Sequence, residues 1–103
     1  MIRPLLWPAL LLGLIVSPGL PAAPVSPDRD IAAGRKLFLM NCAHCHGADA
    51  SGDEGPDLHD LRKTDERITT IIKGGIKGEM PRFNAKLSDA DVKTLVAYLR
   101  SLH

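Results

Sequence analysis

Aromatic residues and cysteines are scarce in this 103-residue chain, and neither sign of charge is in large excess. Beyond residue 23 the aromatics are only Phe38, Phe83 and Tyr98, and there is no tryptophan. A domain of roughly 80 residues buries only ~60% of the surface that its unfolded chain exposes. The two cysteines, Cys42 and Cys45, are too close in sequence to cross-link distant parts of a fold. The composition therefore predicts one small domain whose own side chains make a marginal core.

The balance of charge argues against one large class of partner. Residues 24–103 carry 12 Lys and Arg against 12 Asp and Glu, so their formal net charge is zero. A nucleic-acid-binding protein normally has a basic excess that neutralises phosphates. We therefore expect no nucleic-acid partner.

Residues 1–23 have the three-part pattern of a secretory signal peptide. Arg3 is followed by an apolar stretch from Leu5 to Val16 and then by proline, glycine and small residues. This stretch is shorter than the ~20 residues that a membrane-spanning helix needs. We expect the segment to be removed near Ala23, which leaves residues 24–103 as one periplasmic domain. An uncleaved membrane anchor and a buried helix remain as the alternatives.

The spacing of apolar residues beyond residue 23 predicts helices and no strands. A first helix is expected from Ser26 as cap and Pro27 as first residue. A second is expected from about Thr64 to the glycine pair 74–75, and a last one opens at Ser88 with Asp91 completing a capping box. Glycine-rich loops are expected over residues 47–55 and 74–86. The fold class is therefore all-α.

The motif that carries chemistry is Cys42-Ala-His-Cys45-His46, the C-x-x-C-H pattern of covalent haem attachment. Two thiols three residues apart lie on one side of a helical turn and can add to the two vinyl groups of one porphyrin. The following imidazole of His46 is then held under the iron as an axial ligand. We expect one covalent haem c per chain, and this large apolar group would complete the core. A thioredoxin-like redox pair, a structural zinc site and a short disulfide are the alternatives.

Residues 28–102 resemble a class I cytochrome c of the short bacterial kind. Four pieces match in order, and they are Gly34-x-x-x-Phe38 before the C-x-x-C-H motif, Gly55-Pro-Asp-Leu58, Gly78-Glu-Met80-Pro81, and Leu95-x-x-Tyr98. The resemblance implies a small helical fold wrapped around the haem, with the first and last helices crossing. It also implies that the carbonyl of Pro56 accepts a hydrogen bond from His46 and that Leu58 packs on the haem. Arg62, Lys63 and Arg82 are the candidate donors to the haem propionates.

The second axial ligand must come from elsewhere in the chain. Met80 follows His46 by 34 residues, in a loop rich in glycine, and the resemblance also implies this residue. Met40 is too close to the attachment turn to reach the opposite haem face. Two alternatives stay open, namely that Met80 only fills a gap in the core and that His59 or His103 is the ligand.

These residues predict a periplasmic carrier of single electrons and not an enzyme, because His46 and Met80 would fill both axial positions of the iron. We expect transient redox partners, no small-molecule substrate and a monomer. The alternatives are a haem c subunit of a larger dehydrogenase or terminal oxidase complex, and a haem enzyme or gas sensor with an open iron site. Acidic residues gather before the middle helix and basic residues surround Met80. These runs of charge are either plain solvated surface or a docking site for a partner.

Overall fold

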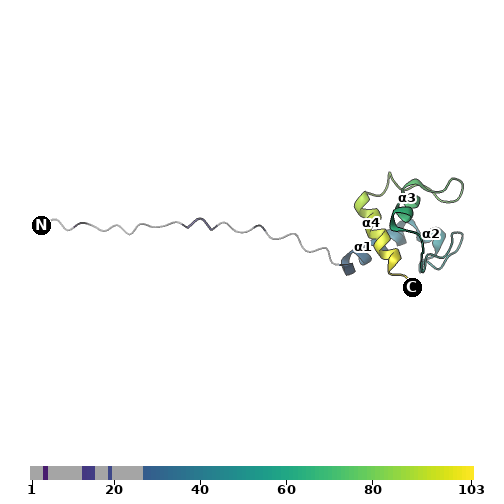
Figure 1. The fold of residues 1–103 in the computed structure, drawn as a ribbon, viewed down its shortest axis with the longest axis horizontal. Helices are drawn as coiled ribbons and strands as arrows, with labels where there is room; N and C mark the ends of the chain where they lie inside the picture. The colour runs from purple at the N-terminus through teal and green to yellow at the C-terminus, as the bar shows by residue number, and fades with distance from the viewer. Residues whose placement is uncertain (1–3, 5–12, 16–18, 20–26) are drawn as a thin grey trace.

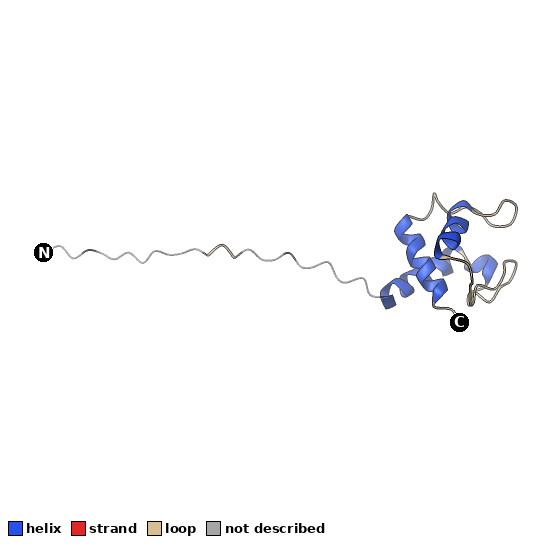
Figure 2. Ribbon diagram, in the orientation of Figure 1, coloured by secondary structure: helices blue, strands red, loops and turns tan. Residues whose placement is uncertain are grey.

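The computed structural model describes residues 4, 13–15, 19 and 27–103. The domain is built from four helices, α1 Pro27–Asn41, α2 Ala43–His46, α3 Asp65–Gly74 and α4 Asp89–Arg100. Figure 2 shows helices and loops but no strand among the described residues. The expected all-α class is therefore confirmed. The signal peptide predicted over residues 1–23 lies outside the described residues, except for residues 4, 13–15 and 19.

Two of the helices begin where their capping residues predict. The Thr64 side chain accepts a hydrogen bond of 3.1 Å from the Arg67 N–H at the start of α3. At the start of α4, Ser88 and Asp91 exchange two bonds of 3.0 Å and form a complete capping box. These bonds satisfy N–H groups that have no partner within the helix. The helix α1 begins at Pro27, as expected, but its predicted cap at Ser26 lies outside the described residues.

The first and last helices cross in close contact at Gly34. A Cβ atom at this position would lie 2.0 Å from the Thr94 carbonyl oxygen and 2.8 Å from the Tyr98 Cβ. One turn further along α1, the Phe38 and Tyr98 rings are tilted against each other with their centroids 5.3 Å apart. The helix crossing that the resemblance implied is confirmed.

The helices α3 and α4 run antiparallel, since ion pairs join them at both ends. Lys73 Nζ lies 2.6 Å from Asp89 Oδ1, and Arg100 Nε lies 2.7 Å from Asp65 Oδ1. A groove of about 470 Å³ lies between the two pairs, lined by residues of both helices. Solvent-exposed pairs of this kind contribute little to stability individually, so packing must hold the helices together.

The core draws on loops as well as helices. Val92, Leu95 and Leu99 of α4 are buried, as their spacing predicts. The sequence did not indicate that Phe83, in the expected loop at 74–86, and Leu87, between that loop and the last helix, would also be buried. Figure 1 shows the two longest loops, after α2 and after α3, projecting on the side of the domain away from the start of α1. Among the described residues, none of the helices has the length and apolarity to cross a membrane.

Candidate functional site

The C-x-x-C-H motif forms a single tight helical turn. Cys42 caps α2, and its carbonyl accepts hydrogen bonds from the N–H groups of Cys45 at 3.2 Å and His46 at 3.1 Å. The turn ends at Gly47, whose positive φ of 82° favours glycine and whose N–H bonds to Ala43. Both cysteines are half-buried and free. The structure thus places two thiols and an imidazole on one four-residue helix and its cap, as the motif predicts.

One hydrogen bond orients the His46 ring. Its Nδ1 lies 2.8 Å from the carbonyl oxygen of Pro56, ten residues along the chain. Nδ1 is the donor in this bond, because a carbonyl can only accept, and Nε2 is then left as the nitrogen with a free lone pair. A metal-bound histidine usually has its second nitrogen fixed in this way. The contact that the resemblance implied is present, and the ligand role of His46 stays a prediction.

The loop after α2 folds back over the motif. The Cys45 carbonyl accepts a 2.6 Å bond from the Gly55 N–H, and the His46 carbonyl accepts a 2.8 Å bond from the Gly52 N–H. A Cβ on Gly55 would lie 2.8 Å from the His46 Cε1 and 2.9 Å from its Nδ1. Only glycine therefore allows the loop to approach the imidazole this closely. The structure thus gives a reason for Gly55, to which the sequence assigned no role of its own.

Met80 is held by its own loop. Its N–H and carbonyl both bond to the main chain of Ile76 at 2.8 Å, which makes an isolated antiparallel bridge. Gly75 also lies against the main chain of Met80, because a Cβ at Gly75 would be only 2.5 Å from the Met80 carbonyl oxygen. The Met80 side chain is half-buried and packs on the hydrophobic core. Its position is therefore determined by main-chain geometry as well as by side-chain packing.

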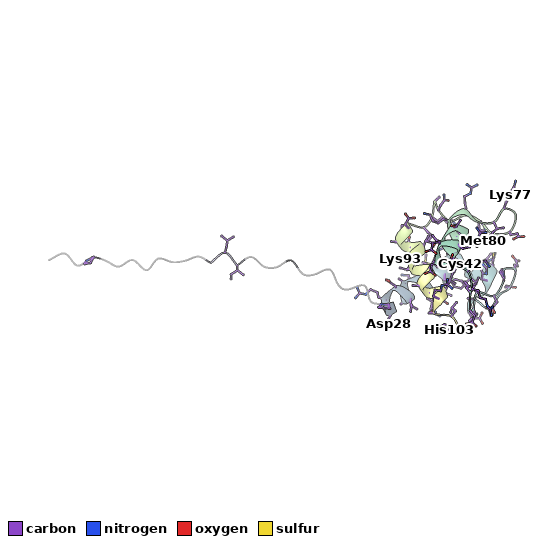
Figure 3. The ribbon with its side chains drawn as sticks, viewed as in Figure 1. Asp28, Cys42, Lys77, Met80, Lys93 and His103 are labelled. Carbon is purple, nitrogen blue, oxygen red and sulfur yellow. The ribbon has the colours of Figure 1, made fainter. Side chains whose placement is uncertain are left out.

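The surroundings of the cysteines fit a thioether link to an apolar group. Burial, with a smaller contribution from Cys45, raises the pKa of the Cys42 thiol to about 11. A reactive or metal-binding cysteine needs a stabilised thiolate, and this environment stabilises the neutral sulfur instead. Cys42 itself packs on the hydrophobic core, as do the half-buried apolar side chains of Leu58, Leu61, Met80 and Leu102. Figure 3 labels Cys42 and Met80 on the domain. These residues fit a haem attached at the motif.

The two alternative histidines have carboxylate partners. His59 Nδ1 lies 2.6 Å from Asp57 Oδ1, and the hydrogen bond that the imidazole donates to this carboxylate raises the pKa of His59. A hydrogen bond from the His59 main-chain N–H, together with this side-chain bond, lowers the pKa of Asp57. His103 Nδ1 lies 3.5 Å from Asp60 Oδ1, and its side chain is 80% exposed. The residues proposed for the propionates, Arg62, Lys63 and Arg82, are all exposed.

The structure also shows contacts that the sequence did not indicate. The pair of Asp57 and His59 follows directly after Pro56, and the i to i+2 spacing of a carboxylate and a histidine was its only signal. Arg100 on α4 makes two contacts with the segment before α3 and a third with Asp65, the first residue of α3. No local pattern in the sequence could have shown this, because its partners lie 35 to 39 residues away.

Comparisons with known proteins agree with the fold and the motif. The family model described as cytochrome c oxidase, cbb3-type, subunit III, matches residues 29–99. The CcoP subunit of the cbb3-type cytochrome c oxidase of Rubrivivax gelatinosus is 40% identical over 89 residues, which are 80% of this chain and 29% of that protein. The chain thus spans less than a third of the length of this curated relative.

Two solved cytochromes resemble the chain in structure. Cytochrome cL from Hyphomicrobium denitrificans superposes with a TM-score of 0.67 and 28% identity, over 74% of this chain and 49% of that one. The c-type cytochrome SorU from Sinorhizobium meliloti gives a TM-score of 0.59 and 33% identity, over 73% of this chain and 92% of that one. The fold and the motif define a class I c-type cytochrome domain with covalent haem c. The chain belongs to the family of the cbb3-type oxidase subunit III cytochrome domain.

Proposed function

We propose that this chain is a soluble periplasmic carrier of single electrons, with one haem c attached at Cys42 and Cys45 and ligated by His46 and Met80. The observation that supports this most is the fixed position of Met80, whose main chain is bonded twice to Ile76. A ligand that the backbone holds in place occupies its axial position on the iron and prevents other molecules from binding there. Haem iron with both axial positions occupied exchanges electrons with partners and does not bind a substrate. In this proposal the protein is therefore not itself an enzyme.

The residues around the haem have separate tasks in this proposal. Cys42 and Cys45 would hold the group by thioethers, while the Pro56 carbonyl fixes the orientation of the His46 ring and leaves its Nε2 as the nitrogen that would bind iron. The thioether sulfur of Met80 favours the ferrous state and raises the reduction potential relative to a second histidine. Leu58 and Leu61 exclude water from the apolar side of the site. Rigid ligands and excluded water keep the site unchanged between the two redox states.

A charged surface at the Met80 loop suits a transient partner. The loop from Gly74 to Arg82 lines a hollow of about 650 Å³, in which Ile76 is 42% exposed. Lys77 and Arg82 line this hollow, with Glu79 as the acidic residue among its lining residues. Complementary charge at such a site mainly raises the rate of association, and salt screens it.

The first test determines whether both axial positions of the iron are occupied. Haem-loaded protein is purified from the periplasm, reduced, and exposed to carbon monoxide at neutral pH. We expect fast electron exchange with hexacyanoferrate and no rapid binding of carbon monoxide. Rapid binding would contradict Met80 ligation and favour an open-site enzyme or gas sensor.

The docking surface has its own test. Lys77→Glu should slow oxidation by the hexacyanoferrate anion at low salt, and the difference should shrink as salt is added. Lys93→Glu makes the same change of charge in the groove between α3 and α4, so it is the matched control. Equal effects of the two variants would contradict docking at the Met80 loop.

A second candidate function is a haem subunit within a larger oxidase complex. The 40% identity to a CcoP subunit favours this candidate. Fractionation of native cells separates the two, since a carrier should appear in the periplasm as a monomer on size exclusion. Recovery only in a membrane complex would support the subunit.

A further inference from the structure

Arg100, the last residue of α4, connects this helix to the chain that precedes α3 and to the first residue of α3. Its Nε donates to Asp65 Oδ1 at 2.7 Å and its Nη1 to the Leu61 carbonyl at 2.7 Å, while its Nη2 donates to the Lys63 carbonyl. The planar guanidinium presents these donors in a fixed fork. One side chain therefore fixes three points within five residues of chain.

The connected chain, residues 56–64, contains no helix, and its Leu58 and Leu61 side chains pack on the hydrophobic core. Its first residue, Pro56, accepts the hydrogen bond from His46. The Leu58 N–H then bonds to the Ala50 carbonyl at 2.8 Å, and the Asp60 N–H bonds to the Leu102 carbonyl at 3.2 Å. Asp60 has a positive φ of 52°, which a residue other than glycine adopts at some cost. The surrounding contacts must hold segment 56–64 in this shape.

We propose that Arg100 is a positioning residue for His46. By fixing the second half of segment 56–64 it keeps the Pro56 carbonyl in place on the His46 Nδ1–H. The strength of that hydrogen bond sets how strongly the imidazole donates to a metal at Nε2. This inference rests on the proposed role of His46 as an axial ligand. It adds a residue that touches neither haem nor ligand and yet determines the reduction potential.

The burial of the contacts separates this role from a general effect on stability. Lys63 is exposed, and Leu61 is only half-buried, so water can replace the lost donors when Arg100 is changed. The domain should then remain folded while segment 56–64 loses its attachment to α4. A lysine keeps the charge of Arg100, but its single ammonium group cannot bridge the two carbonyls and the carboxylate with the same fork.

The experiment uses haem-loaded full-length protein with three variants. Arg100→Lys removes the fork and keeps the charge. Asp65→Asn removes the negative charge beside Arg100 and keeps a side-chain oxygen that can accept the hydrogen bond from the Arg100 Nε. Lys73→Met removes the other ion pair between α3 and α4, which has a similar length, and is the control for loosening of the helix pair. The readouts are the midpoint potential and the exchange rate of the His46 Nδ1–H measured by NMR.

We expect Arg100→Lys to shift the midpoint potential and to speed exchange of the His46 Nδ1–H about tenfold. Loss of a typical hydrogen bond changes an opening equilibrium by about this factor. Asp65→Asn and Lys73→Met should leave both readouts as in the wild type. Wild-type values in Arg100→Lys would overturn the proposal, and so would an equal change in Lys73→Met. If the spectrum of the wild-type protein shows no histidine bound to the iron, the proposed function itself is overturned. This result can be obtained before any variant is made.

Discussion

The contact at Gly34 allows the strongest test of the fold. In Gly34→Ala the new methyl group would lie 2.0 Å from the Thr94 carbonyl oxygen and 2.7 Å from its carbon. These distances are roughly 1.5 Å and 1 Å short of an optimal contact. The obstructing atoms belong to the backbone of α4, so they cannot turn aside as a flexible side chain can. The helices α1 and α4 must separate.

The cost follows from two opposing effects. Overpacking a tight contact costs about 1–3 kcal/mol, and a backbone obstruction belongs at the upper end of this range. Alanine is favoured over glycine within a helix by about 1 kcal/mol, which offsets part of the cost. The net loss is about 2 kcal/mol. In a domain of this size a loss of 1 kcal/mol lowers Tm by roughly 4–8 °C, so Gly34→Ala should melt roughly 8–16 °C lower.

The assay is thermal unfolding of the haem-loaded protein, followed by circular dichroism at 222 nm. Gly74→Ala is the matched control, because Gly74 is also helical and a Cβ there would meet nothing within 4 Å. The control should melt at the wild-type temperature or slightly above it. If Gly34→Ala melts together with Gly74→Ala, the two helices do not cross as closely as the structure shows and the reasoning is wrong.

Three further predictions concern the site. Met80→Ala should abolish the weak far-red absorption band of a methionine-ligated ferric haem, lower the reduction potential and admit carbon monoxide; an unchanged spectrum would reopen the choice of a histidine as ligand. Gly75→Ala should weaken Met80 ligation much more than Gly78→Ala, since both positions have a positive φ but only Gly75 meets the Met80 main chain, and cyanide binding to the ferric protein measures this. Asp57→Asn should bring the raised pKa of His59 back toward its ordinary value in an NMR titration. The stabilisation from this pair is complete below the ordinary histidine pKa and is lost as pH rises through the raised one, so the variant should lose that pH dependence of stability.

The elements that could be predicted from the sequence are those set by neighbouring residues. The starts of α3 and α4 depend on hydrogen bonds that span only three residues, from Thr64 to Arg67 and between Ser88 and Asp91. The C-x-x-C-H turn is equally local, and its spacing by itself predicts the chemistry of attachment. For the same reason the glycine-rich loops were expected from composition, although their contribution to the core was not.

The tertiary structure decided which distant groups meet. The sequence placed Phe83 in an expected loop and Leu87 directly after it, and only packing shows that both are core residues. It contained Gly55 as part of a motif, and only the folded loop shows that the glycine makes room for the His46 ring. Arg100 finds the Leu61 carbonyl 39 residues away. Contacts at such separations depend on the three-dimensional path of the chain, which no pattern of neighbouring residues encodes. The motif of this protein therefore determines its cofactor, while the fold determines how firmly His46 and Met80 are held in position.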